Sequence, residues 1–226
     1  SDLQFGFRKG RSTVDALSAF QIAVSRGFEY CERSRKACHV AGLFCDVQKA
    51  FDTVPFNQLV QVLGEEFKVP AGLLRFLSSY LSGRMMRVRV GEELSEAREV
   101  LSGVPQGSIL GPLLFIAYID RLGKMSYSDN ARAILYADDL VYLKPIVSEA
   151  DRSAFMADVE KIEQAFTSLD LKLNAKKCKL MHFRLSTKPE LPVFDVRIAD
   201  CPLEIVDEYK YLGIVLDQEL TFREHC

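Results

Sequence analysis

Apolar residues recur every three or four positions in several stretches of the chain, which is the spacing of a helix with one buried face. The first stretch follows Ser12 and Thr13, and either residue can serve as its N-cap. Two further helices are expected after Pro55 and Pro70, because proline is favoured in the first helical turn. A long helix is expected from about Ser148. The apolar positions are Leu17, Phe20, Val24 and Phe28 in the first helix and Phe155, Val159, Ile162 and Phe166 in the last.

Continuous apolar runs and alternating patterns predict strands between these helices. The run "HVAGLFCDV", residues 39–47, is apolar up to Asp46 and is typical of a central strand that ends in a carboxylate. The stretch "ARAILYADDLVYLKP", residues 131–145, predicts a hairpin with Asp138 and Asp139 at its tip. The last third of the chain carries short strand-like pieces, which predict a small sheet packed against the helices.

Two stretches between the first strand and this hairpin indicate less regular structure. In "MMRVRVGEEL" arginines alternate with valines before Gly91, the pattern of a hairpin with one basic face or of a solvated edge. "GVPQGSILGP" has the composition of an irregular loop. Gly111 and Pro112 at its end fit the N-cap and the first position of a following core helix.

The composition narrows the fold and the partners. A chain of 226 residues with 48% hydrophobic content and intermixed helices and strands predicts one compact α+β unit. Its formal net charge is −2, so any contact with nucleic acid must be local. The six cysteines are scattered without a CxxC pair, which indicates neither a zinc ribbon nor a disulfide framework. No apolar stretch approaches the roughly 20 residues of a membrane span, so no membrane partner is expected.

Three carboxylates form the candidate chemical site. If the strand before Asp46 lies beside the hairpin tip, Asp46, Asp138 and Asp139 converge on one edge of a sheet. Converging carboxylates repel one another, and hard oxygen ligands of this kind suit Mg²⁺. Two such ions can activate an attacking hydroxyl and stabilise a departing pyrophosphate. Each feature also has a plainer explanation, since adjacent aspartates are common in turns and Asp46 could cap a following helix.

Six blocks of sequence then point to a known family. They are "QFGFRKGRST", "FCDVQKAFD", "GVPQGSILGPLLF", "YADD", "LKLNAKKCKLM" and "YKYLGIVLD", in this order, and they span Gln4 to Asp217. Together they resemble the reverse transcriptases, in particular those of LINE-type (non-LTR) retrotransposons. The resemblance implies an RNA-directed DNA polymerase that extends a primer 3′ end with dNTPs. The implied fold is a polymerase palm, an antiparallel sheet with helices packed on one face, with partial fingers and no thumb.

The resemblance also assigns roles to single residues. Asp46 and Asp138 would be the principal catalytic metal ligands, Asp139 a supporting carboxylate, and Val47 a further contact to metal and nucleotide. Lys177 would protonate the leaving pyrophosphate, although Ala175 stands where relatives often have proline. The implied nucleotide-binding residues are Val47, Phe51, Gln106 and Gly107, and the implied template and primer contacts are Arg8, Arg11, Pro105, Tyr211, Leu212 and Gly213.

Most of these assignments have a structural alternative. Phe51 would lie beneath the incoming sugar and exclude a 2′-hydroxyl, but it could also be a core residue. A turn explains Gly107, though not the whole of "PQGS". A solvated charged face explains the arginines and Lys177, and a plain strand explains Tyr211. The two rival functions are a catalytically silent, exapted RNA-binding or interaction module, disfavoured by the three intact acids, and an RNA-copying palm polymerase, disfavoured by Phe51.

The resemblance finally implies an organisation and a set of partners. Residues 1–38 would form partial fingers with a template-contacting segment, and residues 39–226 a palm that includes a terminal primer-supporting small sheet. Two Mg²⁺ ions, with Mn²⁺ as a substitute, an RNA template, a DNA primer and dNTPs would bind. Nucleus and cytoplasm are the implied locations, and the oligomeric state is left open. We expect an excised fragment that binds nucleic acid weakly, since many phosphate contacts normally contribute to such binding.

Overall fold

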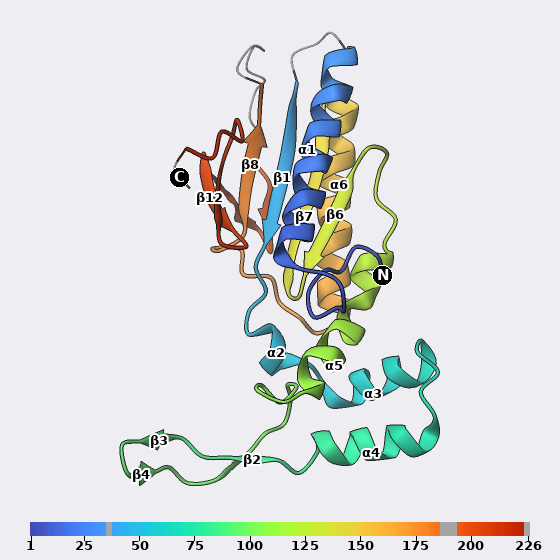
Figure 1. The fold of residues 1–226 in the computed structure, drawn as a ribbon, viewed down its shortest axis with the longest axis vertical. Coiled ribbons are helices and arrows are strands. Elements are labelled where there is room, and N and C mark those ends of the chain that lie inside the picture. Colours follow the sequence, from blue (N-terminus) through green and yellow to red (C-terminus); the bar gives the residue numbers. More distant parts are fainter. Residues whose placement is uncertain (35–37, 186–193, 224–226) are drawn as a thin grey trace.

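A five-stranded sheet forms the centre of the molecule (Figure 1). The computed structural model describes residues 1–34, 38–185 and 194–223. The strand order is β11-β8-β1-β7-β6, and every pairing is antiparallel except that of β11 with β8. These strands are β1 (His39–Cys45), β6 (Arg132–Tyr136), β7 (Asp139–Ile146), β8 (Lys179–Phe183) and β11 (Glu204–Ile205). All seven residues of β1 are buried, as expected for a central strand.

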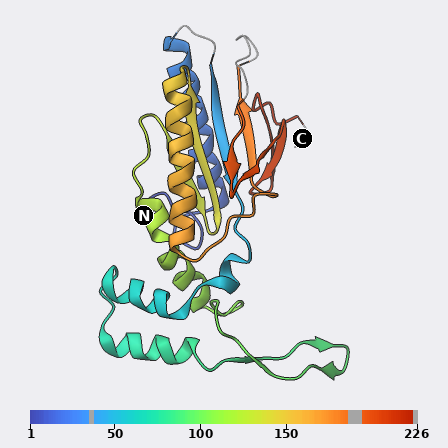
Figure 2. The ribbon, with the colours of Figure 1, turned by 180° about the vertical axis from the view of Figure 1, so that it is seen from behind.

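Helices cover both faces of this sheet. Figures 1 and 2 show α1 (Thr13–Ser34) on one face and α6 (Glu149–Ser168) on the other. Phe20 of α1 packs edge-on against Phe183 of β8, with ring centroids 5.5 Å apart. Phe155 of α6 packs against Tyr142 of β7 at 5.2 Å. The α+β class is confirmed. Helices cover both faces of the sheet, however, where packing on one face was expected, because a central strand that is apolar on both faces needs two covering layers.

A group of shorter elements lies beyond one end of the sheet (Figure 1). It contains α2 (Ala50–Thr53), α3 (Phe56–Glu65), α4 (Ala71–Leu81) and α5 (Leu110–Tyr118). The 3-10 helix η1 (Ile119–Lys124) follows α5 and contacts β6 and α6. Pro55 and Pro70 precede α3 and α4 as predicted. The predicted start of α5 at Gly111 is late: the helix begins at Leu110, and the Gly111 N–H donates to the Ser108 hydroxyl at 2.9 Å.

A two-stranded arm projects from this end. It consists of β2 (Met85–Met86) paired with β5 (Arg98–Glu99), and β3 (Arg89–Val90) paired with β4 (Glu93–Leu94). The predicted hairpin around Gly91 is confirmed, and Gly91 has the positive φ of 62° that its turn requires. Every residue of the four strands is exposed.

The C-terminal strands do not form the single small sheet that their pattern predicted. β8 and β11 belong to the central sheet. Two separate ribbons remain, β9 (Arg197–Ile198) with β10 (Cys201–Pro202) and β12 (Glu208–Tyr211) with β13 (Ile214–Asp217). The pattern fails here because short strands of similar composition do not reveal their partners. Within the described residues, no helix has the length and apolar content to cross a membrane.

Candidate active site

The pairing of β1 with β7 brings the predicted carboxylates to one end of the sheet. Cys45, the last residue of β1, pairs with Leu140 in antiparallel register. Asp46 directly follows Cys45 and Asp139 directly precedes Leu140, so the two aspartates lie at the same end of the sheet. Tyr136 pairs with Asp139, which leaves Ala137 and Asp138 as the two residues of the turn. The predicted hairpin with both aspartates at its tip is therefore confirmed.

The three carboxylates perturb one another. Burial raises the pKa of Asp138 above its ordinary value, and the charge of Asp46 raises it further. The pKa of Asp139 rises to about 6, first through burial and then through the charges of Asp138 and Asp46. Nearby like charges and partial burial disfavour the ionised forms. A cation held between these side chains would relieve this cost, since an opposite charge favours the ionised form.

The donor set suits a hard cation but does not enclose one. Among the described residues, no group of three His, Cys, Asp or Glu side chains is arranged to hold a metal ion. Mg²⁺ is usually bound by one or two carboxylates, with waters and substrate phosphates completing its octahedron. Asp46, Asp138 and Asp139 fit that mode, in which the ion is held jointly with a phosphate. Val47 has an apolar side chain, so only its backbone carbonyl could serve as a ligand.

The segment after β1 is held by residues that follow α6. Val47 and Leu173 form an isolated antiparallel bridge. The backbone N–H of Gln48 donates to the carbonyl of Lys172 at 2.8 Å. The "LKLNAKKC" stretch thus extends the pairing of β1 beyond the sheet, and it brings two distant blocks of the sequence to one place.

Asp46 itself is fixed by three neighbours from that stretch. Its carbonyl accepts from the N–H of Asn174 at 2.8 Å. The thiol of Cys178 accepts from the Asp46 N–H at 3.3 Å and donates to the Asp46 carbonyl at 3.7 Å. The ammonium of Lys177 lies 3.9 Å from Oδ1 of Asp46 on the exposed side. Lys177 therefore belongs to the carboxylate site, whereas the role of Cys178 in holding Asp46 carried no signal in the sequence.

Phe51 lies in a stack of aromatic rings beside this site. Its ring is half-buried and stacks on Phe115 with centroids 4.0 Å apart, while Phe7 meets it edge-on at 6.1 Å. A core contact and a nucleotide contact are compatible for such a ring, because one face is covered and part of it stays exposed. The N-cap of α2 is Lys49, so the alternative role of Asp46 as a helix cap does not apply.

The "GVPQG" stretch packs alongside α2. The N–H of Val104 donates to the carbonyl of Phe51 at 2.8 Å. The side-chain amide of Gln106 donates to Oδ1 of Asp52 at 2.7 Å. These contacts bring Gln106 and Phe51, two of the four predicted nucleotide contacts, to neighbouring positions.

The backbone around Pro105 is tightly packed on one side and open on the other. The Pro105 carbonyl accepts from the Ser108 hydroxyl at 2.7 Å, and a β-carbon on Gly111 would come within 2.4 Å of that carbonyl. Gly107, by contrast, has a φ of 77° and faces open space. A glycine in this setting lets another backbone approach closely, which agrees with its predicted contact but does not test it.

The β12–β13 ribbon packs on the face of the sheet that carries α1. The ring of Tyr211 is buried 5.7 Å from the rings of both Phe20 and Phe44. Leu212 and Gly213 form the turn of the ribbon, with positive φ values of 47° and 89°. The predicted primer contacts therefore lie on a hairpin turn, and the buried Tyr211 anchors that hairpin.

Tyr209 links the ribbon to the carboxylates and was not singled out from the sequence. Its ring lies 4.5 Å from that of Phe44, on the strand that leads to Asp46. Burial raises the pKa of Tyr209 to about 12, and the charges of Asp139 and Asp46 add to the shift. The ribbon therefore lies within the electrostatic field of the carboxylate site.

The predicted template-binding arginines contact their own segment. Arg8 donates to the carbonyl of Gln4 at 3.3 Å and lies 3.9 Å from the carboxylate of Asp2. Arg11 lies 3.8 Å from the same carboxylate, and its guanidinium stands 4.8 Å over the ring of Phe5. Both side chains are partly exposed, so contact with template phosphates stays a prediction.

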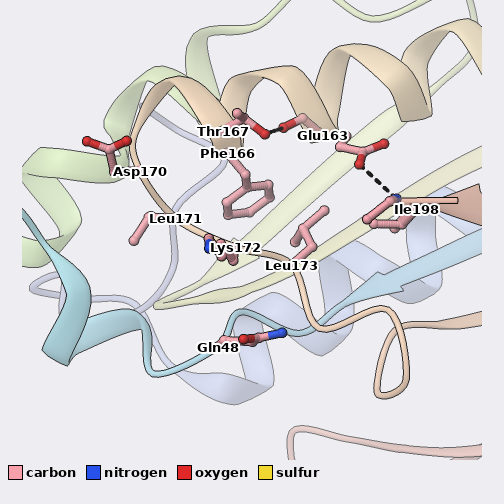
Figure 3. A pocket seen from close by; sticks show the side chains of 10 residues that line it. Gln48, Glu163, Phe166, Thr167, Asp170, Leu171, Lys172, Leu173 and Ile198 are labelled. Atoms are coloured by element: carbon pink, nitrogen blue, oxygen red, sulfur yellow. Dashed lines mark hydrogen bonds between the residues drawn. The ribbon is translucent and has the colours of Figure 1, made fainter. Parts of the chain in front are cut away.

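A cavity of about 510 Å³ lies at the end of α6 (Figure 3), and part of its lining is Gln48, Lys172 and Leu173, which hold the segment after β1. Its apolar part includes the ring of Phe166, and Glu163 at its rim accepts from the N–H of Ala199 at 2.8 Å. The lining consists of Gln48, Glu163, Phe166, Thr167, Asp170, Leu171, Lys172, Leu173, Ile198 and Ala199. The three carboxylates are not among them, so the chemistry lies outside this cavity.

The chain as a whole matches a known protein family. The family described as "Reverse transcriptase (RNA-dependent DNA polymerase)" matches residues 1–216. The chain belongs to this family, and the predicted resemblance is confirmed.

Named relatives agree with this assignment. The chain is 31% identical over 229 residues to the probable RNA-directed DNA polymerase from transposon X-element of Drosophila melanogaster, covering 98% of this chain and 24% of the relative. It is 33% identical over 241 residues to the corresponding protein from transposon BS of the same organism, covering 99% and 24%. The chain therefore spans about a quarter of the length of these relatives.

Solved structures agree on the fold. The structure of apo telomerase from Candida tropicalis, truncated from its C-terminal domain, matches with a TM-score of 0.61 at 10% sequence identity. The match covers 98% of this chain and 40% of that one. The predicted polymerase type of α+β fold is therefore confirmed.

Proposed function

We propose that this chain supplies the catalytic palm of an RNA-directed DNA polymerase. The observation that carries the proposal is the register of β1 and β7, which brings the end of β1 to the hairpin turn, where the charge of Asp46 raises the pKa of both Asp138 and Asp139. The substrates are a DNA primer on an RNA template and dNTPs. The proposal concerns the polymerase of which this chain is the palm, and weak or no activity is expected of the chain by itself.

Asp46, Asp138 and Asp139, with the carbonyl of Val47, would hold two Mg²⁺ ions or Mn²⁺ in their place. When bound, such ions supply activation of the primer 3′-hydroxyl and stabilisation of the leaving pyrophosphate. The ammonium of Lys177 lies 3.9 Å from Asp46 and would donate a proton to that pyrophosphate.

The neighbouring residues would bind the substrates. Phe51, Gln106 and Gly107 would border the incoming nucleotide. Tyr211, Leu212 and Gly213 would support the primer end, while Arg8, Arg11 and Pro105 would contact the template. Two observations support these roles. The backbone at Gly107 has a positive φ and faces open space. The β12–β13 ribbon packs through Tyr211 on Phe44, in the strand that leads to Asp46.

Asp138→Asn tests the proposal in primer extension with an RNA template, dNTPs and Mg²⁺. The amide is nearly isosteric with the carboxylate but carries no charge to hold a cation. We therefore expect a loss of several kcal/mol of transition-state stabilisation, which lowers the rate about 10²- to 10⁴-fold. The control is Asp200→Asn, which removes the same charge from an exposed turn with a φ of 60°, a conformation that asparagine tolerates. We expect the control to keep wild-type activity.

Activity that survives Asp138→Asn would overturn the proposal and favour an exapted binding module. Equal incorporation of dNTPs and rNTPs by the wild type would instead favour an RNA-copying enzyme. The family assignment also leads us to propose residence in the nucleus and cytoplasm, which imaging of the tagged protein in cells would test.

A further inference from the structure

Gln4 is a buried polar side chain that binds Ala137, 133 positions away in sequence. It is only 3% exposed. Its amide nitrogen donates to the carbonyl of Ala137 at 3.1 Å, and its amide oxygen accepts from the N–H of Ala137 at 2.9 Å. The same oxygen accepts from the N–H of Gly6 at 2.7 Å. One carboxamide thus satisfies both backbone groups of Ala137.

Ala137 is the strained residue of the catalytic hairpin turn. Its φ is 54°, in the left-handed region that residues with a β-carbon rarely adopt. It directly precedes Asp138, so its backbone conformation sets the direction in which the Asp138 side chain leaves the turn. The hydrogen bonds of Gln4 hold this conformation from outside the hairpin.

The backbone around Gln4 also contacts the hairpin closely. Gln4 and Leu135 form a parallel bridge, in which the Phe5 N–H donates to the Leu135 carbonyl and the Leu135 N–H to the Leu3 carbonyl, both at 2.8 Å. A β-carbon on Gly6 would come within 2.3 Å of the Ala137 nitrogen. The first residues therefore form a short edge partner to β6, and this brings Gln4 to the turn.

We infer that Gln4 is a positioning residue for Asp138. This inference rests on the proposed function: the Gln4 amide fixes the Ala137 peptide, and through it the direction of the Asp138 carboxylate toward its cation and the primer end. Gln4 does not touch the reacting atoms. A displacement of about 1 Å in a reacting group can cost about 10²-fold in rate, so a residue that holds the turn acts on catalysis at a distance.

Gln4→Met is the primary test, because methionine has a similar length and volume but no amide. The matched control is Gln58→Met, in α3, where the amide oxygen accepts from the Tyr118 hydroxyl at 2.7 Å. We expect Gln4→Met to lower kcat for primer extension about 10- to 100-fold with little change in KM for dNTP. Gln58→Met should lower the Tm about as much as Gln4→Met does, but it should leave kcat within about twofold of wild type.

Two readouts do not depend on activity. Amide hydrogen exchange at Ala137 should accelerate in Gln4→Met and not in Gln58→Met. The Kd for Mn²⁺, followed by its EPR signal, should rise about tenfold or more in Gln4→Met alone, since a misdirected Asp138 ligates less well. If Gln4→Met does not fold, Gln4→Asn replaces it: it keeps a polar amide but is one methylene too short to join Gly6 and Ala137.

The outcomes separate this inference from the proposed function. Wild-type kcat and wild-type Mn²⁺ affinity in the Gln4 variants would overturn the inference and leave the polymerase proposal intact. An inactive wild-type parent polymerase, which contains this chain as its palm, would overturn the proposed function. In that case the Ala137 exchange rate and the Mn²⁺ affinity still decide whether Gln4 positions Asp138, and unchanged values would refute it.

Discussion

At the level of single residues, the sequence predicts the carboxylates of the candidate site but not the residues around them. Asp46, Asp138 and Asp139 could be predicted, because each interrupts or ends an apolar run where a charge is costly. Gln4, Cys178 and Tyr209 could not. Gln4 and Cys178 lie 133 and 132 positions from the backbone groups they bind, and no local pattern encodes such a contact.

Phe51 provides a test of sugar selection. Phe51→Val removes the part of the ring that would meet a 2′-hydroxyl, so we expect the ratio of kcat/KM for dNTP over rNTP to fall by about tenfold or more. The variant also loses the stacking on Phe115, which lowers stability. Because both nucleotides are measured on the same variant, a smaller folded fraction cancels in the ratio. An unchanged ratio would assign Phe51 to the core alone.

At the level of elements, the sequence predicts the pieces better than their partners. The central strand, the β6–β7 hairpin and the helices after Pro55 and Pro70 follow from periodicity and start signals. These signals do not predict that β8 pairs with β1 or that α1 covers a second face of the sheet. Strand pairing is decided by tertiary packing, which a local hydrophobic pattern does not contain.

Helix α6 is tied to the sheet through one buried carboxylate. Asp158 has a fully buried side chain that accepts from the Tyr142 hydroxyl at 2.6 Å and the Ser128 N–H at 2.8 Å, and Lys161 lies 2.9 Å away. Burial alone would raise the pKa of Asp158, but these hydrogen bonds outweigh it and the net shift is downward. The depressed pKa means that the ionised carboxylate stabilises the folded state above about pH 4. That contribution is lost as the pH falls further.

Asp158→Asn should therefore lower the free energy of unfolding at pH 7 by about 1–3 kcal/mol. The reason is that an amide cannot accept from all three donors as a carboxylate does. Urea unfolding at pH 7 and pH 3.5 measures the effect, and the difference from wild type should shrink at the lower pH. Glu160→Gln, on the exposed face of the same helix, is the control and should change stability by less than about 0.5 kcal/mol. A pH-independent difference would contradict the role given to the charge.

At the level of the whole molecule, the net charge limits the electrostatic attraction between the chain and nucleic acid. A net charge of −2 provides no long-range attraction, so binding depends on a few local contacts. For two or three phosphate contacts, the logarithm of the binding constant should fall against the logarithm of salt concentration with a slope of about −2 to −3. Fluorescence anisotropy of a labelled primer-template between 50 and 200 mM KCl would measure the slope.

The double variant Arg8→Gln, Arg11→Gln should make that slope less steep by about one unit per lost contact. Arg75→Gln, exposed on α4, serves as the control and should leave the slope unchanged. A slope that the double variant does not alter would show that these arginines serve only their contacts with Asp2 and Phe5.

The pairing of the first residues with β6 has a practical consequence for work with this chain. Residues 1–11 precede helix α1, and Asp46, Asp138 and Asp139 all lie after it. If Gln4 positions Asp138 as inferred, deleting residues 1–11 would remove the support of the YADD turn while leaving these three aspartates in place. A loss of activity in such a deletion would then not show that the deleted residues touch the substrate.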